Sequence, residues 1–318
     1  MSDRRNFLKA GLAGIAAVPV LSSLAGCQTA PVKQASTSGS QSARAGAMST
    51  AKVTERVRII SGVPGNVIVL NSGDGLLLVD TGSPQQAPAV LKSVGGKVRT
   101  LFNTHYHADQ TGGNALFAKA GAEIHAHTIT KQWLAADYYV PADDRWVKAP
   151  PKEAVPTKTF RGRGEMKAGT ESIEFGYLLE AHTRGDAYVY FRDSNVLVAG
   201  DVVSPLRDPV LDWYAGGWLG GRADALDDLL GIGNDQTLVV PAYGKVMTRA
   251  ELQAERDFIA KLYDTTSNLY HHGNSAKDMM DKGVMNGLAR QFQDPAKFLY
   301  DVVKGLQAHY TNFGGNVV

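Results

Sequence analysis

The 318-residue chain has a single cysteine, Cys27. One thiol cannot close an internal disulfide, and it cannot supply a four-cysteine zinc site or an iron–sulfur cluster. Its position near the N-terminus also excludes a cysteine nucleophile in the body of the chain. A strong excess of positive or negative charge is also lacking. The chain has 33 Lys and Arg and 31 Asp and Glu, which gives a net charge of +2. Since no basic excess is available to neutralise phosphates, we expect no nucleic-acid partner.

Long apolar runs are missing as well. Beyond the first 30 residues, no stretch reaches the roughly 18 apolar residues of a membrane-spanning helix, which excludes a multi-span membrane protein. What is present is an ordinary globular composition, 44% hydrophobic and 20% charged, with 34 glycines that favour a fold with many tight turns.

The first residues have the charged start and the short apolar core that are typical of a signal peptide. The run Arg-Arg-x-Phe-Leu-Lys over 4–9 resembles a twin-arginine export signal, and Leu-Ala-Gly-Cys over 24–27 resembles a lipobox. These resemblances predict a signal peptide over 1–26, export to the bacterial periplasm by the twin-arginine route, and a lipid anchor at Cys27.

Outer-membrane sorting is favoured, because Gln28 is not the aspartate that typically retains lipoproteins at the inner membrane. The alternative is an ordinary cleaved signal in which Cys27 is incidental. Residues 27–50 are rich in Ser, Ala, Thr and Gly without an apolar period, and they predict a flexible tether.

The body of the chain alternates strand-like and helix-like segments. The runs over 57–70 and 76–80 predict strands, and 87–93 predicts a helix. Residues 128–158 predict an irregular cap, and the pattern from Arg249 onward is mostly helical. Such alternation is typical of an α/β or α+β protein, in which polar ligand groups collect on the loops beyond the strand ends.

A dense set of potential metal ligands follows the strand-like run over 98–103. His105 and His107 are separated by one residue, and Asp109 follows two residues later. Imidazole and carboxylate groups suit zinc or iron. Because the three groups lie close together at a strand end, just before a Gly-Gly turn, they predict a metal site.

This stretch resembles the His-x-His-x-Asp-His motif of the metallo-β-lactamase superfamily, with Gln110 in place of the last histidine. Four further motifs of that family appear in order along the chain, around Asp80, His182, Asp201 and Tyr243. The resemblance spans about residues 53–250. It implies an α/β (α+β) fold, a four-layer αββα sandwich over 51–250, with a helical C-terminal extension over 251–318.

The resemblance also implies a set of metal ligands. The first metal position of the family is intact and has His105, His107 and His182. Three neutral imidazoles plus a water molecule form an open zinc site of the catalytic type.

The second metal position of the family is altered. It keeps Asp109 and Asp201, but the two histidines that the family places there are Gln110 and Tyr243 in this chain. An amide is a weak zinc ligand, and a phenol binds well only when it is deprotonated. We therefore expect one tight Zn²⁺ ion, with the second position weak, empty or adapted to a harder metal.

The implied reaction is metal-assisted hydrolysis, in which zinc lowers the pKa of its bound water and polarises the substrate carbonyl. Asp109 is expected to orient or deprotonate that water, and Asp201 to complete the zinc shell or to hold the water from the other side. Tyr243 either donates a hydrogen bond to a developing oxyanion or packs as a plain aromatic. Three residues are expected beside the ligands rather than on the metal: Gln110, Asp80 and His127.

The expected partner is a small-molecule substrate with an ester, lactone, thioester or amide bond, a β-lactam among them. Two alternatives remain open. His105, His182 and Asp201 would also form the two-histidine, one-carboxylate triad of a mononuclear iron oxygenase, as in the persulfide dioxygenases. The two replaced ligands also fit a catalytically degenerate, metal-stabilised binding protein. Arg207 and Arg222 are candidates to contact an anionic group of the substrate. The sequence does not indicate which oligomeric state the protein has.

Overall fold

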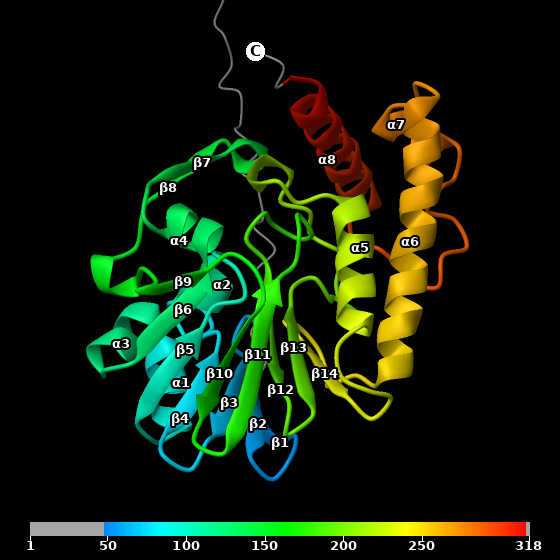
Figure 1. Ribbon diagram of the computed structural model, residues 1–318. Helices are drawn as coiled ribbons and strands as arrows, with labels where there is room; N and C mark the ends of the chain where they lie inside the picture. Colours follow the sequence, from blue (N-terminus) through cyan, green and yellow to red (C-terminus); the bar gives the residue numbers. More distant parts are fainter. Residues whose placement is uncertain (1–47, 316–318) are drawn as a thin grey trace, which may run out of the picture. The chain divides into compact units, whose positions relative to one another are not determined.

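The computed structural model describes residues 48–315 (Figure 1). Its first strand, β1 (Ser49–Lys52), pairs antiparallel with β2 (Val57–Ser61). The expected signal peptide over 1–26, Cys27 and the tether up to residue 47 lie outside the described residues. Between residues 48 and 315, no helix has the length and apolar character needed to cross a membrane.

The first half of the chain forms a seven-stranded sheet (Figure 1). After β1 and β2, its strands in spatial order are β3 (Val67–Asn71), β4 (Leu76–Val79), β5 (Val98–Phe102), β6 (Glu123–His127) and β9 (Lys158–Phe160). Strands β1 to β4 are antiparallel neighbours, whereas β4, β5, β6 and β9 run parallel. Parallel neighbours need crossover connections, and α1 (Ala87–Val94) and α3 (Asn114–Lys119) lie in two of them.

The second half forms a five-stranded sheet. Its strands in spatial order are β10 (Gly164–Ala168), β11 (Glu171–Tyr177), β12 (Ala187–Phe191), β13 (Val196–Gly200) and β14 (Leu238–Pro241). Strands β10 to β13 are antiparallel neighbours, and β13 pairs parallel with β14. The crossover between these last two strands contains α5 (Leu219–Leu230).

Side chains alternate between the two faces of the central strands, and both faces are buried. In β3, Ile68 and Leu70 pack in the core between the two sheets, whereas Val67 and Val69 pack against the helices outside. In β13, Leu197 likewise belongs to the outer cluster, which includes residues of the C-terminal helices. Such strands are continuous apolar runs in the sequence, because the other sheet covers one face and helices cover the other.

The helices form the two outer layers. Helices α1 and α3 cover the first sheet, and α5, α6 (Arg249–His271) and α8 (Pro295–Gly315) lie on the second (Figure 1). The remaining short elements are α2 (Ala108–Thr111), α4 (Thr128–Leu134), α7 (Ala276–Asp281), η1 (Pro141–Asp143), η2 (Lys152–Ala154) and η3 (Trp213–Ala215). This arrangement confirms the predicted four-layer αββα sandwich with a helical C-terminal extension.

Two segments differ from the sequence-based prediction. The run over 57–70 is not one strand, because Gly62 and Gly65 adopt left-handed φ values of 83° and 80° between β2 and β3. Glycine takes this conformation without steric cost, so the chain turns back and the two strands pair as a hairpin. The segment 128–158, expected to be irregular, contains α4 and a two-stranded sheet of β7 (Tyr138–Val140) and β8 (Arg145–Val147).

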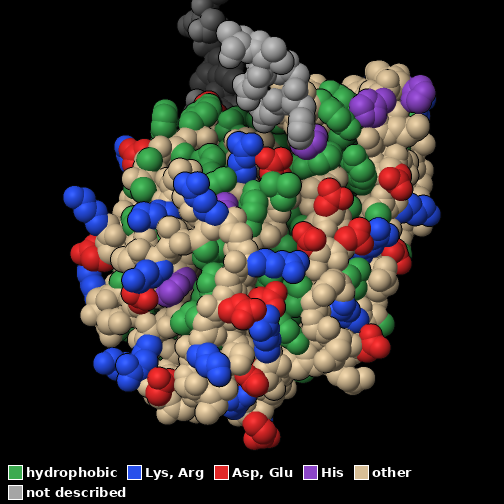
Figure 2. Space-filling model, viewed as in Figure 1, with side chains coloured by type: hydrophobic (Ala, Val, Ile, Leu, Met, Phe, Trp, Pro, Cys, Tyr) green, Lys and Arg blue, Asp and Glu red, His purple; other side chains and the backbone are tan. Residues whose placement is uncertain are grey.

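Acidic and basic side chains are interspersed over the face drawn in Figure 2, and hydrophobic side chains gather toward the top of the view. A mixed surface of this kind offers, on that face, no extended field of one sign that would steer a charged polymer.

Candidate metal centre

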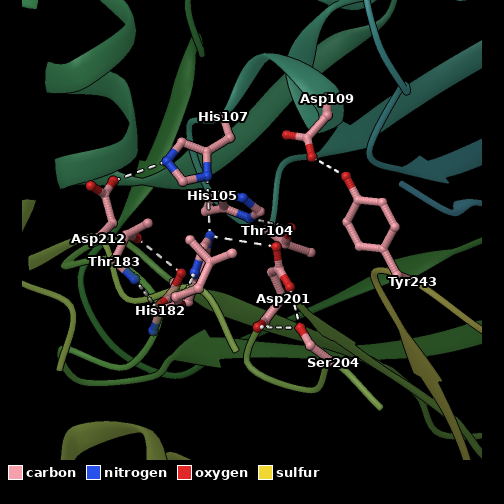
Figure 3. A network of polar contacts seen from close by, with 12 residues as sticks. Thr104, His105, His107, Asp109, His182, Thr183, Asp201, Ser204, Asp212 and Tyr243 are labelled. Atoms are coloured by element: carbon pink, nitrogen blue, oxygen red, sulfur yellow. Dashed lines mark hydrogen bonds and ion pairs between the residues drawn. The ribbon is translucent and has the colours of Figure 1, made fainter. Parts of the chain in front are cut away.

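Residues from loops that follow strands of both sheets come together in one polar network (Figure 3). His105 and His107 follow β5, His182 comes after β11, and Asp201 and Tyr243 follow β13 and β14. Strands β11, β13 and β14 run in one direction within the second sheet. Their carboxyl ends therefore share an edge, which is where ligand groups gather in sheets of this kind.

Three imidazoles form the centre of this site. One ring nitrogen from each of His105, His107 and His182 lies within 4.8 Å of the other two. The rings meet edge to face, and their centroids are 4.8, 4.7 and 4.9 Å apart. In the part of the chain that the structure describes, neither Asp109 nor Asp201 belongs to this group.

Thr104 and Asp80 orient the ring of His105. The Nδ1 atom of His105 lies 3.1 Å from the Thr104 hydroxyl oxygen, and that hydroxyl donates to Asp80 Oδ2 at 2.7 Å. Because the single hydroxyl hydrogen of Thr104 is directed at Asp80 Oδ2, the hydroxyl oxygen accepts the Nδ1–H of His105. The lone pair of His105 is then on Nε2, a buried atom without a hydrogen-bond partner among the described residues.

Asp80 lies at the turn after β4. Its backbone is left-handed, with φ of 63°, and its Oδ1 accepts the amide of Thr104 at 2.8 Å. Burial raises the pKa of Asp80 to about 8, although both hydrogen bonds from Thr104 act in the opposite direction.

Asp212 orients the ring of His107. The Nε2 atom of His107 lies 2.9 Å from Asp212 Oδ2, which accepts the Nε2–H and leaves the lone pair on Nδ1. The same oxygen accepts the hydroxyl of Tyr106. Burial alone would lower the pKa of His107, but the hydrogen bond and the charge of Asp212 outweigh burial and raise it. A carboxylate in this place makes the imidazole a more basic ligand.

A backbone carbonyl orients the ring of His182. The Nδ1 atom of His182 lies 2.8 Å from the carbonyl oxygen of Val210, which accepts the Nδ1–H and leaves the lone pair on Nε2. Asp186 fixes the loop itself, because its Oδ2 accepts the amides of His182 and Thr183, each at 2.7 Å.

These three imidazoles fit a metal ion. His107 Nδ1 and His182 Nε2 are 3.1 Å apart, and both carry lone pairs once their other nitrogens are committed. A proton on His107 Nδ1 would satisfy His182 but would leave His105 Nε2 unpaired, whereas a metal ion satisfies all three. Burial lowers the pKa of His105 and of His182 well below the usual value, and the neighbouring histidines act in the same direction. Both rings are thereby kept in the neutral form that binds metal.

Asp109 and Tyr243 meet on one side of the imidazole group (Figure 3). Asp109 lies in the first turn of α2, and its Oδ2 accepts the hydroxyl of Tyr243. Burial and the charge of Asp109 raise the pKa of Tyr243, so the phenol keeps its proton at neutral pH. In this structure the hydroxyl is therefore a donor to Asp109.

Asp201 lies next to the three imidazoles, but both of its oxygens are engaged by this chain. Its Oδ1 accepts the hydroxyl of Ser204, and its Oδ2 pairs with Arg207 Nη2. The same Oδ2 is 3.6 Å from His182 Nε2. The guanidinium carbon of Arg207 lies 3.8 Å from the centroid of the Tyr243 ring.

Arg222 is fully buried, so the prediction that it meets a substrate is wrong. Its Nη1 donates to the carbonyl of Val210 at 3.0 Å, and its Nη2 donates to the carbonyl of Asp201 at 2.6 Å. Arg222 therefore holds the loop that supplies the carbonyl partner of His182.

Gln110 and His127, the two other residues expected beside the metal ligands, make contacts elsewhere. The side chain of Gln110 is buried against Gly65, and neither of its amide atoms has a hydrogen-bond partner among the described residues. The ring of His127 stacks on Tyr177 with centroids 4.1 Å apart, and its Nδ1 accepts the amide of Ile129 at 3.4 Å. His127 thus caps the start of α4.

Sequence reasoning missed the groups that orient the three rings. These are the hydroxyl of Thr104, the carboxylate of Asp212 and the carbonyl of Val210. Thr104 directly precedes His105, and a search of the residues next to each histidine would have found it. Asp212 and Val210 lie in a segment without an apolar period, so no pattern marks them.

Residues 60–241 match the family model of the metallo-beta-lactamase superfamily. The chain belongs to this superfamily, and the protein is a metal-dependent hydrolase. The family that the motifs resemble is thereby confirmed.

Individual relatives are distant. The chain is 24% identical over 202 residues to a metallo-beta-lactamase type 2 from Bacillus cereus, over 62% of this chain and 73% of that protein. It is 28% identical over 266 residues to the alpha subunit of 2,4-dinitroanisole O-demethylase from Nocardioides sp. (strain JS1661), over 80% and 71% of the two chains. The solved structure of a stereoselective inverting sec-alkylsulfatase from Pseudomonas sp. is similar with a TM-score of 0.60 at 17% identity, over 85% of this chain and 50% of that chain. At this identity the likeness shows the fold alone.

Proposed function

We propose that this protein is an exported, zinc-dependent hydrolase that opens an ester, lactone, thioester or amide bond, with one zinc ion held by His105, His107 and His182. One observation carries the proposal. Each imidazole has one nitrogen bound to an outside partner, and the remaining nitrogens of His107 and His182 are 3.1 Å apart. One nitrogen of each of the three rings lies within 4.8 Å of one nitrogen on both other rings. Three imidazoles with an open fourth position are the donor set of catalytic zinc.

Zinc bound there would lower the pKa of a water ligand and polarise the bond to be cleaved. Asp109, two residues after His107, would take a proton from the attacking water. The hydroxyl of Tyr243 holds the Asp109 carboxylate in place. Ser204 and Arg207 hold the carboxylate of Asp201 in place, so Asp201 would limit the directions from which the water attacks.

The first test is the metal content of residues 28–318, purified without added metal and measured by plasma mass spectrometry. We expect near one zinc per chain, lost in His107→Ala and kept in His272→Ala, whose imidazole is exposed on α6's C-terminal end. Two zinc ions per chain would contradict the single-zinc proposal. Iron near one per chain would favour the oxygenase with His105, His182 and Asp201 instead.

The second test is turnover on a panel of substrates. Aryl esters, lactones, thioesters and a chromogenic β-lactam represent the proposed bonds, and the Bacillus relative supports including the β-lactam. A nitro-substituted aryl methyl ether and a secondary alkyl sulfate extend the panel toward the other two relatives. We expect hydrolysis of at least one member, abolished in His107→Ala. Tight zinc without turnover on any member would favour the binding-protein alternative.

Export and lipidation are part of the proposal and rest on residues 1–27 alone. We expect the full chain to fractionate with membranes of the cell envelope, and Cys27→Ser to release it into the soluble periplasmic fraction. Replacing Arg4 and Arg5 by lysine should retain the precursor in the cytoplasm. Membrane association that persists in Cys27→Ser would contradict the lipid anchor.

A further inference from the structure

The carboxylate of Asp201 is buried beside the three imidazoles and needs a counter-charge. Its side chain is 0% exposed, and an unpaired carboxylate in such a place is costly. Arg207 supplies the counter-charge, because its Nη2 pairs with Asp201 Oδ2, the oxygen that is 3.6 Å from His182 Nε2. Ser204 donates to the other oxygen.

The same guanidinium also reaches the second carboxylate of the site, through Tyr243. Arg207 lies over the Tyr243 ring at 3.8 Å, and the hydroxyl of that ring donates to Asp109. Arg207 and Tyr243 thus connect Asp201 to Asp109 in one chain of contacts. These two carboxylates are the ones that would otherwise hold a second metal ion.

The donors left at this position do not fit a second metal ion. Both oxygens of Asp201 and Oδ2 of Asp109 already accept hydrogen bonds from this chain, and Gln110 is turned against Gly65. A guanidinium stays protonated, so it cannot give up its charge to make room for a metal cation. A metal ion bound to Asp201 on that side would also lie close to the positive charge of Arg207.

We infer that the guanidinium of Arg207 takes the place of the second metal ion, neutralises Asp201 and limits the centre to one metal. This inference rests on the proposed single-zinc hydrolase. It makes Arg207 a positioning residue that holds Asp201, rather than an anchor for a distant group of the substrate. Through their contact with each other, Arg207 and Tyr243 also connect the two carboxylates, which neither residue could do alone.

The test is to incubate the protein with excess zinc, remove unbound zinc by gel filtration and measure the number of zinc ions per chain. Gln110→His with Tyr243→His restores two imidazoles, and we expect this double variant to stay at one zinc while Arg207 is present. Adding Arg207→Ala should raise the count to two, whereas adding Arg207→Lys, which keeps the charge, should leave it at one. Two zinc ions in the double variant would overturn the inference, and so would a folded Arg207→Ala triple variant that stays at one.

A single substitution provides an independent measurement if the multiple variants do not fold. Equilibrium dialysis of Arg207→Ala should show a gain of about tenfold or more in affinity for a second zinc ion, because a nearby like charge is removed. Arg256→Ala is the matched control, since it removes an arginine that pairs with Asp227 on the helical layer. Equal second-zinc affinity in wild type and Arg207→Ala would overturn the inference. His107→Ala tests the proposed function separately, because it concerns the first zinc ion only.

Discussion

The Nε2 atom of His107 lies 2.9 Å from Oδ2 of Asp212, a residue that follows it in the chain by 105 positions. The carboxylate is buried and also accepts the hydroxyl of Tyr106. Because Asp212 accepts the Nε2–H, it is Nδ1 of His107 that faces the other two imidazoles. Asp212 therefore decides which nitrogen of His107 is available to a metal ion.

Asp212→Ala should weaken zinc binding about 10- to 100-fold, the usual effect of removing a partner that orients a ligating histidine. The affinity is measured by competition with a chromophoric chelator. Asp281→Asn is the control, because that carboxylate is exposed and pairs only within its helix region. Unchanged affinity in a folded Asp212→Ala protein would mean that packing against Tyr106 alone orients the ring.

Thr104→Val should weaken zinc binding through His105, and it should also reduce stability. Valine has nearly the shape of threonine but removes the hydroxyl between Asp80 and His105. We expect a loss of about 1–3 kcal/mol in the free energy of unfolding, because the buried Asp80 loses a hydrogen bond. Thr104→Ser keeps the hydroxyl and should retain most of the zinc affinity. If serine and valine had equal effects on zinc affinity, the hydroxyl would not be the orienting group.

The imidazole group could be predicted from the sequence because its signal is local. His105 and His107 lie within one loop after a strand, and His182 sits in a second recognisable loop motif. Their partners could not be predicted in the same way. Asp212 contacts His107 only because the segment after β13 folds back over the strand ends, and that segment has no apolar period to place it.

Two of the wrong sequence-based predictions could have been avoided, because the sequence contains a signal for the observed structure. Gly62 and Gly65 flank Pro64 inside the run over 57–70, a combination that marks a turn. Arg222 lies three residues after Leu219 and four before Leu226, so helical spacing puts it on the buried face of α5. The start of α4 had no such signal, because His127 caps it instead of the usual Ser, Thr, Asp or Asn.

Arg222→Met should lower the free energy of unfolding by about 2–4 kcal/mol, because hydrogen bonds from a charged donor to buried carbonyls are lost. The affected carbonyls belong to Asp201 and Val210, so zinc affinity should fall as well. Urea unfolding monitors the first effect and chelator competition the second. Arg256→Met, on a partly exposed surface pair, should change stability by about 0.5 kcal/mol or less. A stability loss without any change in zinc affinity would separate Arg222 from the orientation of His182.

The capping box of α6 should make stability depend on acidic pH. The hydrogen bond from Lys245 and those from Thr248 lower the pKa of Glu251 to about 2, below its ordinary value of 4.5. A carboxyl whose pKa is lower in the folded state stabilises the protein above pH 4.5, and this contribution is lost as the pH falls from 4.5 toward 2.

Glu251→Gln should therefore be less stable than wild type at pH 7, and the difference should shrink toward zero as the pH approaches 2. The side chain of Glu251 is 39% exposed, so solvent screening limits the difference at pH 7 to about 0.5–1 kcal/mol. Urea unfolding midpoints between pH 7 and pH 3 measure it. Thr248→Ala removes the hydroxyl that accepts the amide of Glu251, and because a hydroxyl does not titrate, part of its effect should persist at pH 3. A Glu251→Gln difference that stays constant across this range would show that the charge of Glu251 contributes nothing and that only the shape of the cap matters.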